Sequence, residues 1–200
     1  MFYMDVRHPF FLPEECMADK VAVFIDGGYL SFVTKQLGGS EPLQIDFAAL
    51  SSKITSSDEL LRTYYYDSPP FVSSQPSEEE RARQKSFDRF RYALNMIDRF
   101  EVRLGKLRRY YDAQGNEQFE QKGVDVYLAI DALTLAVKGR IQKAIFITGD
   151  SDFVPVLQAI KNEGVETILY YTNQSVNHHL LEVADQRILL SRTFLEQCKR

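Results

Sequence analysis

The sequence predicts an α/β protein in which a parallel β-sheet carries helices on both faces. Short apolar runs alternate along the chain with longer amphipathic segments, and this alternation is typical of strand–helix–strand units. The first run, VAVFI at residues 21–25, is apolar at every position, as expected for a strand buried on both faces. Crossovers between parallel strands are right-handed and lay the helices on the faces of the sheet.

Capping and breaking residues mark the ends of the predicted elements. Gly38, Gly139 and Gly164 follow helical segments, and Ser77 with Glu80 forms a capping box in front of the longest helix. After the first strand, further strands are expected at residues 60–66, 100–111, 143–148 and 165–171. Helices are expected at residues 29–37, 44–54, 78–98, 124–137, 153–162 and 176–186, and residues 112–123 are expected to form a loop.

Length and composition favour a single domain. The 200 residues are 44% hydrophobic and 26% charged, which suffices for a sizeable core. We expect residues 20–200 to form this domain and residues 1–19 to be an extension. The aromatic side chains of the extension are expected to pack on the domain; binding a protein partner or self-association is the alternative. The apolar runs are too short to span a membrane, no secretory signal is visible, and the two cysteines lack a disulfide pattern, which favours the cytoplasm.

Charge is distributed unevenly along the chain. The formal net charge is −4, but residues 81–109 contain ten Lys and Arg against three Asp and Glu. Taken alone, such a segment favours an ordinary solvated helix face with charge pairing, and a surface that binds nucleic acid is the alternative.

Aspartates follow several of the predicted strands. Asp26 ends the first strand, Asp67 the second, and Asp150 and Asp152 follow the strand at 143–148. Asp125 begins the helix that leads into that strand, and a helix antiparallel to the strands starts at their carboxyl ends. Ligands of open parallel sheets bind outside those ends, so we expect these side chains at one edge.

Converging carboxylates favour a divalent cation. They raise one another's pKa unless positive charge compensates, and oxygen-rich sites suit Mg²⁺ or Mn²⁺. Each aspartate also has a structural alternative: Asp26 as a turn residue, Asp125 at a helix dipole, and Asp152 as a helix cap. Asp67 is either a turn residue or part of the site. Tyr66 either fills the core or stacks on a base.

Three segments resemble a known family. The stretches VFIDGGYL, QKGVDVYLAIDAL and ITGDSDFVPVLQAIKNEGVETILY resemble, in this order and spacing, the LabA-like branch of the NYN domain, in the PIN-like nuclease group. The resemblance covers roughly residues 20–190. It implies a three-layer α/β/α sandwich with strand order 3-2-1-4-5. It also implies a divalent-metal site whose matching residues are Asp26, Asp125, Asp150 and Asp152, with Thr148 supporting them.

The resemblance implies an RNase, acting either as an endoribonuclease or as an exoribonuclease. The metal would activate a water that attacks the phosphodiester, leaving a 5′-phosphate and a 3′-hydroxyl. Contacts to RNA phosphates are expected from four basic residues, Lys106, Arg108, Arg109 and Lys122. Many members carry Asn where this chain has Tyr29, so a non-catalytic metal- or RNA-binding scaffold is the alternative. A haloacid-dehalogenase-type phosphatase is disfavoured because Asp26 lacks a second aspartate two residues on.

Overall fold

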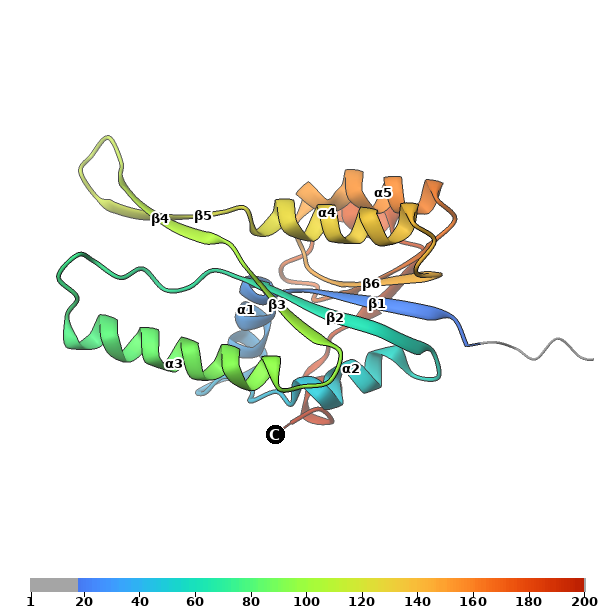
Figure 1. Ribbon diagram of the computed structural model, residues 1–200, viewed down its shortest axis with the longest axis horizontal. Coiled ribbons are helices and arrows are strands. Elements are labelled where there is room, and N and C mark those ends of the chain that lie inside the picture. Colours follow the sequence, from blue (N-terminus) through green and yellow to red (C-terminus); the bar gives the residue numbers. More distant parts are fainter. Residues whose placement is uncertain (1–17, 200) are drawn as a thin grey trace, which may run out of the picture.

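A parallel sheet runs through the centre of the structure, with helices above and below it (Figure 1). The computed structural model describes residues 18–199, so the predicted extension at residues 1–19 lies almost wholly outside the described residues. Within them the central sheet has six strands in the order β3-β2-β1-β6-β7-β8, and every neighbouring pair is parallel. The predicted α/β class is therefore correct.

The elements follow the expected alternation of strands and helices. The strands of the central sheet are β1 (Lys20–Asp26), β2 (Glu59–Asp67), β3 (Phe100–Leu104), β6 (Lys143–Ile147), β7 (Glu166–Tyr171) and β8 (Gln186–Leu189). The helices are α1 (Gly27–Gly38), α2 (Phe47–Thr55), α3 (Glu78–Asn95), α4 (Val124–Val137), α5 (Val154–Asn162), α6 (His178–Val183) and α7 (Arg192–Glu196), with a 3₁₀ turn, η1 (Ser151–Phe153), before α5. None of the helices in residues 18–199 is both long and apolar enough to cross a bilayer.

Strand β1 shows how the sheet separates two cores. Its side chains alternate, so that Ala22 and Phe24 face the core under α4, α5 and α6, while Val23 and Ile25 face the core over α1, α2, α3 and α7. All of these side chains are fully buried. A strand buried on both faces must be apolar at every position, which is why residues 21–25 predicted it correctly.

The strand order extends the predicted one. Strands β3-β2-β1-β6-β7 reproduce the order 3-2-1-4-5, and β8 adds a sixth strand that pairs with β7 from Ile168–Gln186 to Tyr171–Leu189. The prediction of helix at residues 176–186 was too long, because α6 ends at Val183. Residues 186–189 are mostly exposed. A short edge strand of this kind lacks the continuous apolar run that announces a central strand.

The prediction of one strand at 100–111 and a loop at 112–123 was wrong. Strand β3 ends at Leu104, and the chain turns out of the sheet to form a separate antiparallel hairpin, β4 (Lys106–Tyr111) with β5 (Glu117–Lys122). At the bend, a Cβ on Gly105 would lie 2.5 Å from Val124 Cγ2 and 2.7 Å from the Lys122 carbonyl oxygen. All residues of β5 except Phe119 are polar, so only their pairing with β4 identifies them as a strand.

Candidate metal and nucleic-acid site

Asp26 lies where β1 passes into α1. One carboxylate oxygen accepts a hydrogen bond from the Tyr29 backbone N–H (3.0 Å), which makes Asp26 the N-cap of α1. The other oxygen accepts a hydrogen bond from the Thr148 hydroxyl (3.3 Å). The turn role considered from sequence is thus present, and the side chain is fixed from two sides.

Thr148 connects the ends of β1 and β6. Its side chain is fully buried, and its hydroxyl oxygen accepts a hydrogen bond from the Asp150 N–H (3.3 Å) while donating to Asp26. Asp150 in turn caps η1, because its carboxylate accepts from the Asp152 N–H (3.0 Å). The sequence had suggested Asp152 as the helix cap; the hydrogen bonds assign that role to Asp150. Asp152 instead lies within the first turn of η1.

Asp125 reaches the same edge from another layer. Helix α4 begins directly after the hairpin, and Asp125 is exposed in its first turn, where the helix dipole favours negative charge. Helix α4 also packs against η1, which carries Asp152. Three segments that are distant in the chain therefore bring four carboxylates toward one another.

The electrostatics of this edge are unfavourable for negative charge. Burial raises the pKa of the Asp26 carboxyl, and the charges of Asp125 and Asp150 raise it further, against the two hydrogen bonds that lower it. Partial burial raises the pKa of the Asp125 carboxyl, and the negative charges of Asp150 and Asp152 raise it further. None of the four forms an ion pair with a basic side chain of residues 18–199.

The carboxylate oxygens at this edge are suitable ligands for a hard divalent cation whose coordination is completed by water or a substrate phosphate. Carboxylate oxygens are the ligands that Mg²⁺ and Mn²⁺ prefer. Within the described part of the chain, however, no three side chains of His, Cys, Asp or Glu stand close enough to hold one ion together. Mg²⁺ is commonly bound by one or two carboxylates, with water and a substrate phosphate completing its shell, and this arrangement is compatible with such binding.

Tyr29 has a structural contact that the sequence did not suggest. Its hydroxyl accepts a hydrogen bond from the Thr172 N–H (2.9 Å) at the end of β7. A Cβ on Gly149 would lie 2.5 Å from the Tyr29 ring and 1.9 Å from the Ser175 carbonyl oxygen, so the turn before Asp150 is closed from both sides. The loop after β7 therefore helps to form the site. Its polar residues directly after a predicted strand were the sequence feature that could have indicated this role.

Two further predictions concerned neighbouring residues. Asp67 accepts hydrogen bonds from the Ser68 N–H (2.7 Å) and the Tyr65 hydroxyl (3.4 Å), which gives it the local role of a turn residue. The suggestion that Tyr66 stacks on a base was wrong: its side chain is fully buried and its hydroxyl donates to Asp131 (3.0 Å). Asp131 of α4 also accepts a hydrogen bond from the Arg103 Nε–H (3.2 Å).

The four basic residues expected to contact RNA all lie on the hairpin. Lys106 and Lys122 are opposite each other at its base, next to the start of α4. Arg108 follows on the same face, because alternate residues of a strand share a face. Arg109 points to the other face, where its guanidinium lies 4.5 Å from the centre of the Phe71 ring and pairs with Glu117 (2.9 Å). The hairpin extends past the edge of the sheet where β1 ends (Figure 1).

Comparisons with known proteins agree with this architecture. A family model described as the NYN domain matches residues 20–191. An uncharacterized protein of Methanocaldococcus jannaschii is 30% identical over 83 residues, which are 40% of this chain and 35% of that protein, so the match spans about a third of the relative's length. A solved structure of a protein of unknown function from Vibrio parahaemolyticus is similar in fold, with a TM-score of 0.64 and 19% identity, covering 91% of this chain and 99% of that one.

Proposed function

Because the chain belongs to the NYN domain family, which has the fold of PIN-like nucleases, we propose that it is a divalent-metal-dependent ribonuclease. The observation that carries this proposal is the convergence of Asp26, Asp125 and the Asp150–Asp152 pair at one edge without a basic partner among residues 18–199. We further assign the chain to the LabA-like branch, on its three sequence motifs, and expect it to act in the cytoplasm as an endoribonuclease.

Each carboxylate would have a distinct part in binding Mg²⁺ or Mn²⁺. Asp26 is oriented by the Tyr29 N–H and the Thr148 hydroxyl, so it presents its oxygens in a fixed direction. Asp150 is held by its bond to the Asp152 N–H, and Asp125 approaches from α4. When bound, the metal supplies a water of lowered pKa and offsets the charge of the phosphate. Without it, four carboxylates repel an RNA phosphate, so placement of the scissile phosphate at this edge depends on the cation, whereas contacts of the RNA with other surfaces do not.

The hairpin would supply the affinity for RNA that the acidic edge lacks. Lys106, Arg108 and Lys122 share one face that begins beside α4, and Arg108 lies next to Tyr110 on the same face, separated by one residue. Tyr110 is 44% exposed. Basic side chains with an accessible aromatic ring are the combination that binds single strands. Binding through phosphates predicts an affinity that falls steeply with salt.

The decisive experiment is a cleavage assay with a matched variant. Purified protein is incubated with single-stranded and structured RNAs in Mg²⁺, Mn²⁺ or chelator, beside Asp26→Asn/Asp150→Asn. Asparagine can keep the capping hydrogen bonds of both positions but weakens metal binding. We expect cleavage only with metal, products with 5′-phosphates, and a loss of at least about 100-fold in the double variant.

The control is Asp98→Asn, the same change at an exposed position between α3 and β3, outside the proposed metal site. It should cleave like the wild type. Equal cleavage by the wild type and the double variant would reveal a contaminating nuclease and overturn the proposal. Metal-dependent stabilisation without cleavage of any RNA would instead support the non-catalytic scaffold.

A further inference from the structure

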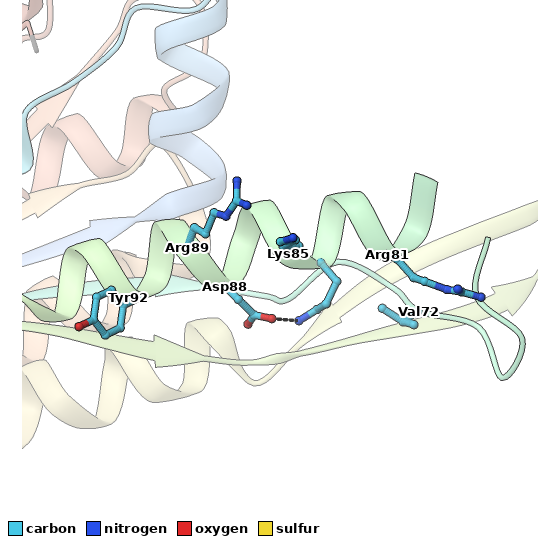
Figure 2. A pocket seen from close by; sticks show the side chains of 7 residues that line it. Val72, Arg81, Lys85, Asp88, Arg89 and Tyr92 are labelled. Carbon is cyan, nitrogen blue, oxygen red and sulfur yellow. Dashed lines mark hydrogen bonds between the residues drawn. The ribbon is translucent and has the colours of Figure 1, made fainter. Parts of the chain in front are cut away.

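Helix α3 carries a basic groove that the proposed catalytic edge does not use. Of its residues only Leu94, near the C-terminal end, is fully buried, and the N-terminal part extends beyond the sheet (Figure 1). Between this part of the helix and the loop that precedes it lies an open groove of about 540 Å³. Figure 2 shows the side chains that line it, among them Val72, Arg81, Lys85, Arg89 and Tyr92.

Three of these side chains form a regular positive row. Arg81, Lys85 and Arg89 are four residues apart, so they follow one another along the helix at intervals of about 6 Å. None of the three forms an ion pair with a residue in the range 18–199. A row of cations at this spacing can contact successive phosphates of an extended strand.

The acidic residue in the groove is already engaged. Asp88 accepts a hydrogen bond from the Gln84 amide (3.2 Å; dashed in Figure 2) and lies 3.5 Å from Arg91. Three acidic residues start α3, namely Glu78, Glu79 and Glu80, and none of them belongs to the groove lining. The carboxylate of Glu80 already accepts hydrogen bonds from the Ser73 hydroxyl (2.8 Å) and the Ser77 N–H (2.9 Å). The positive charge of the row is therefore available to an external anion.

The groove also offers an aromatic surface. Tyr92 is 67% exposed and follows Arg89 by three residues, so its ring lies on nearly the same face of the helix. A positively charged groove with an exposed aromatic ring is characteristic of proteins that hold single-stranded nucleic acid. Charges repeated at about 6 Å along the groove match the successive phosphates of a nucleic-acid strand, so this lining favours a nucleic acid over an acidic protein.

The loop of residues 68–77 connects the groove with the catalytic edge. It leaves β2 at Ser68, beside β1, where Tyr66 pairs with Asp26. Phe71 of this loop contacts Arg109 and Phe119 of the hairpin, while Val72 lines the groove. The basic hairpin and the basic groove are thus on either side of one loop that begins at the edge of the sheet.

We propose that the α3 groove binds the backbone of single-stranded RNA at several nucleotides' distance from the bond that is cut. This inference rests on RNA being the substrate of the proposed nuclease. It adds a length requirement: RNA that reaches only the catalytic edge gains nothing from the groove, whereas longer RNA is held by both surfaces and bound more tightly.

The test measures RNA affinity separately from cleavage. Binding of fluorescent single-stranded RNAs of about 5 and about 30 nucleotides is followed by anisotropy in chelator. The groove variant is Arg81→Gln/Lys85→Gln/Arg89→Gln, and the control variant Arg83→Gln/Lys138→Gln/Arg140→Gln removes three exposed charges outside the groove. All these side chains are exposed, and of the groove residues Arg81 donates to the Pro76 carbonyl oxygen (2.8 Å). Both proteins should therefore stay folded at the assay temperature, which thermal unfolding checks first.

We expect the groove variant to bind the long RNA at least about tenfold more weakly, with a log–log salt slope reduced by about 2 for three lost phosphate contacts. The control variant should stay within about twofold of the wild type for both RNAs. With Mn²⁺, the groove variant should cleave the short RNA at the wild-type rate.

Four results would refute the proposed groove or distinguish it from the proposed catalysis. Equal weakening by both triple variants would mean that overall charge alone matters, and no binding by the wild type would refute the groove outright. If a polyglutamate peptide competes as well as RNA of equal charge, the groove belongs to an acidic protein partner. If binding depends on the groove but the wild type cleaves nothing, the proposed catalysis fails and the groove stands.

Discussion

Carboxylates at the two ends of the parallel sheet differ in whether a lysine pairs with them. At the amino ends of the strands, Asp19 and Asp58 both contact Lys143 Nζ (3.1 and 2.9 Å), and Asp185 contacts Lys161 Nζ (2.8 Å). At the carboxyl ends, Asp26, Asp125, Asp150 and Asp152 have no such partner among residues 18–199.

The difference indicates which carboxylates stabilise the folded protein through ion pairs. Hydrogen bonds from Lys161 and Thr167 lower the pKa of Asp185 although partial burial acts in the other direction, and the bonds of Lys143 raise the pKa of its ammonium group. Both shifts favour the charged pairs. At the other end the pKa values of Asp26 and Asp125 are raised, so the fold is strained by their charge. An external cation would relieve that strain, and this contrast can be tested end by end.

The largest expected effect is stabilisation by metal at the carboxyl end. If Mn²⁺ binds the folded protein, a concentration of 100 times the Kd stabilises it by about 2.7 kcal/mol. The Asp26→Asn/Asp150→Asn variant should show no such rise in Tm, while in chelator it should unfold no earlier than the wild type because a repulsion is removed. Thermal unfolding with and without Mn²⁺ measures this, and an equal metal response in both proteins would refute the contrast.

A smaller effect is expected when the amino end is changed. Asp58→Asn removes a largely buried carboxylate that accepts two bonds from Lys143 Nζ, at 3.1 and 2.9 Å. We expect a loss of about 1.5 kcal/mol in the free energy of unfolding, the low end for hydrogen bonds to charged groups, because Asp19 still pairs with Lys143. The rise in Tm with Mn²⁺ should be unchanged. Urea denaturation of the variant beside Asp98→Asn checks this; loss of the metal response would show that the two ends are coupled.

The smallest effect concerns pH. The pKa of Asp185 is lower in the folded than in the unfolded protein, so its contribution is present above the unfolded pKa of about 3.9 and disappears as the pH falls through the folded value. Because the ion pair is about a third exposed, we expect Asp185→Asn to cost less than about 1 kcal/mol at pH 7 and still less near pH 3. Urea denaturation at both pH values measures the difference; an equal cost at both would exclude the charged pair as the cause.

The central fold could be predicted from sequence because its signals are local. Residues 21–25 and 144–147 are apolar at every position, and the capping box of Ser77 with Glu80 forms as expected at the start of α3. Hairpin β4–β5 and strand β8 carry no comparable signal. Their residues are mostly polar and exposed, and they become strands only through hydrogen bonds to a partner elsewhere in the chain.

The candidate site divides in the same way. The positions of Asp26, Asp125, Asp150 and Asp152 at the ends of predicted elements suggested one edge of the sheet. The sequence could not assign the cap of η1 to Asp150, because both aspartates suit a helix start. It also could not show that Tyr66 is buried, since its environment is made by Asp131 and Arg103 from other elements.

By itself, therefore, the sequence determined the alternation of strands and helices, the apolar face of each, and the acidic residues at the strand ends, since hydrophobic periodicity and capping act over a few residues. Only the tertiary structure decided that six of the ten basic residues in segment 81–109 divide between a hairpin and the α3 groove on either side of one loop. That division depends on Gly105, where the close approach of Val124 and Lys122 turns the chain out of the sheet. Contacts between residues so far apart in the chain follow from packing, and no local pattern encodes them.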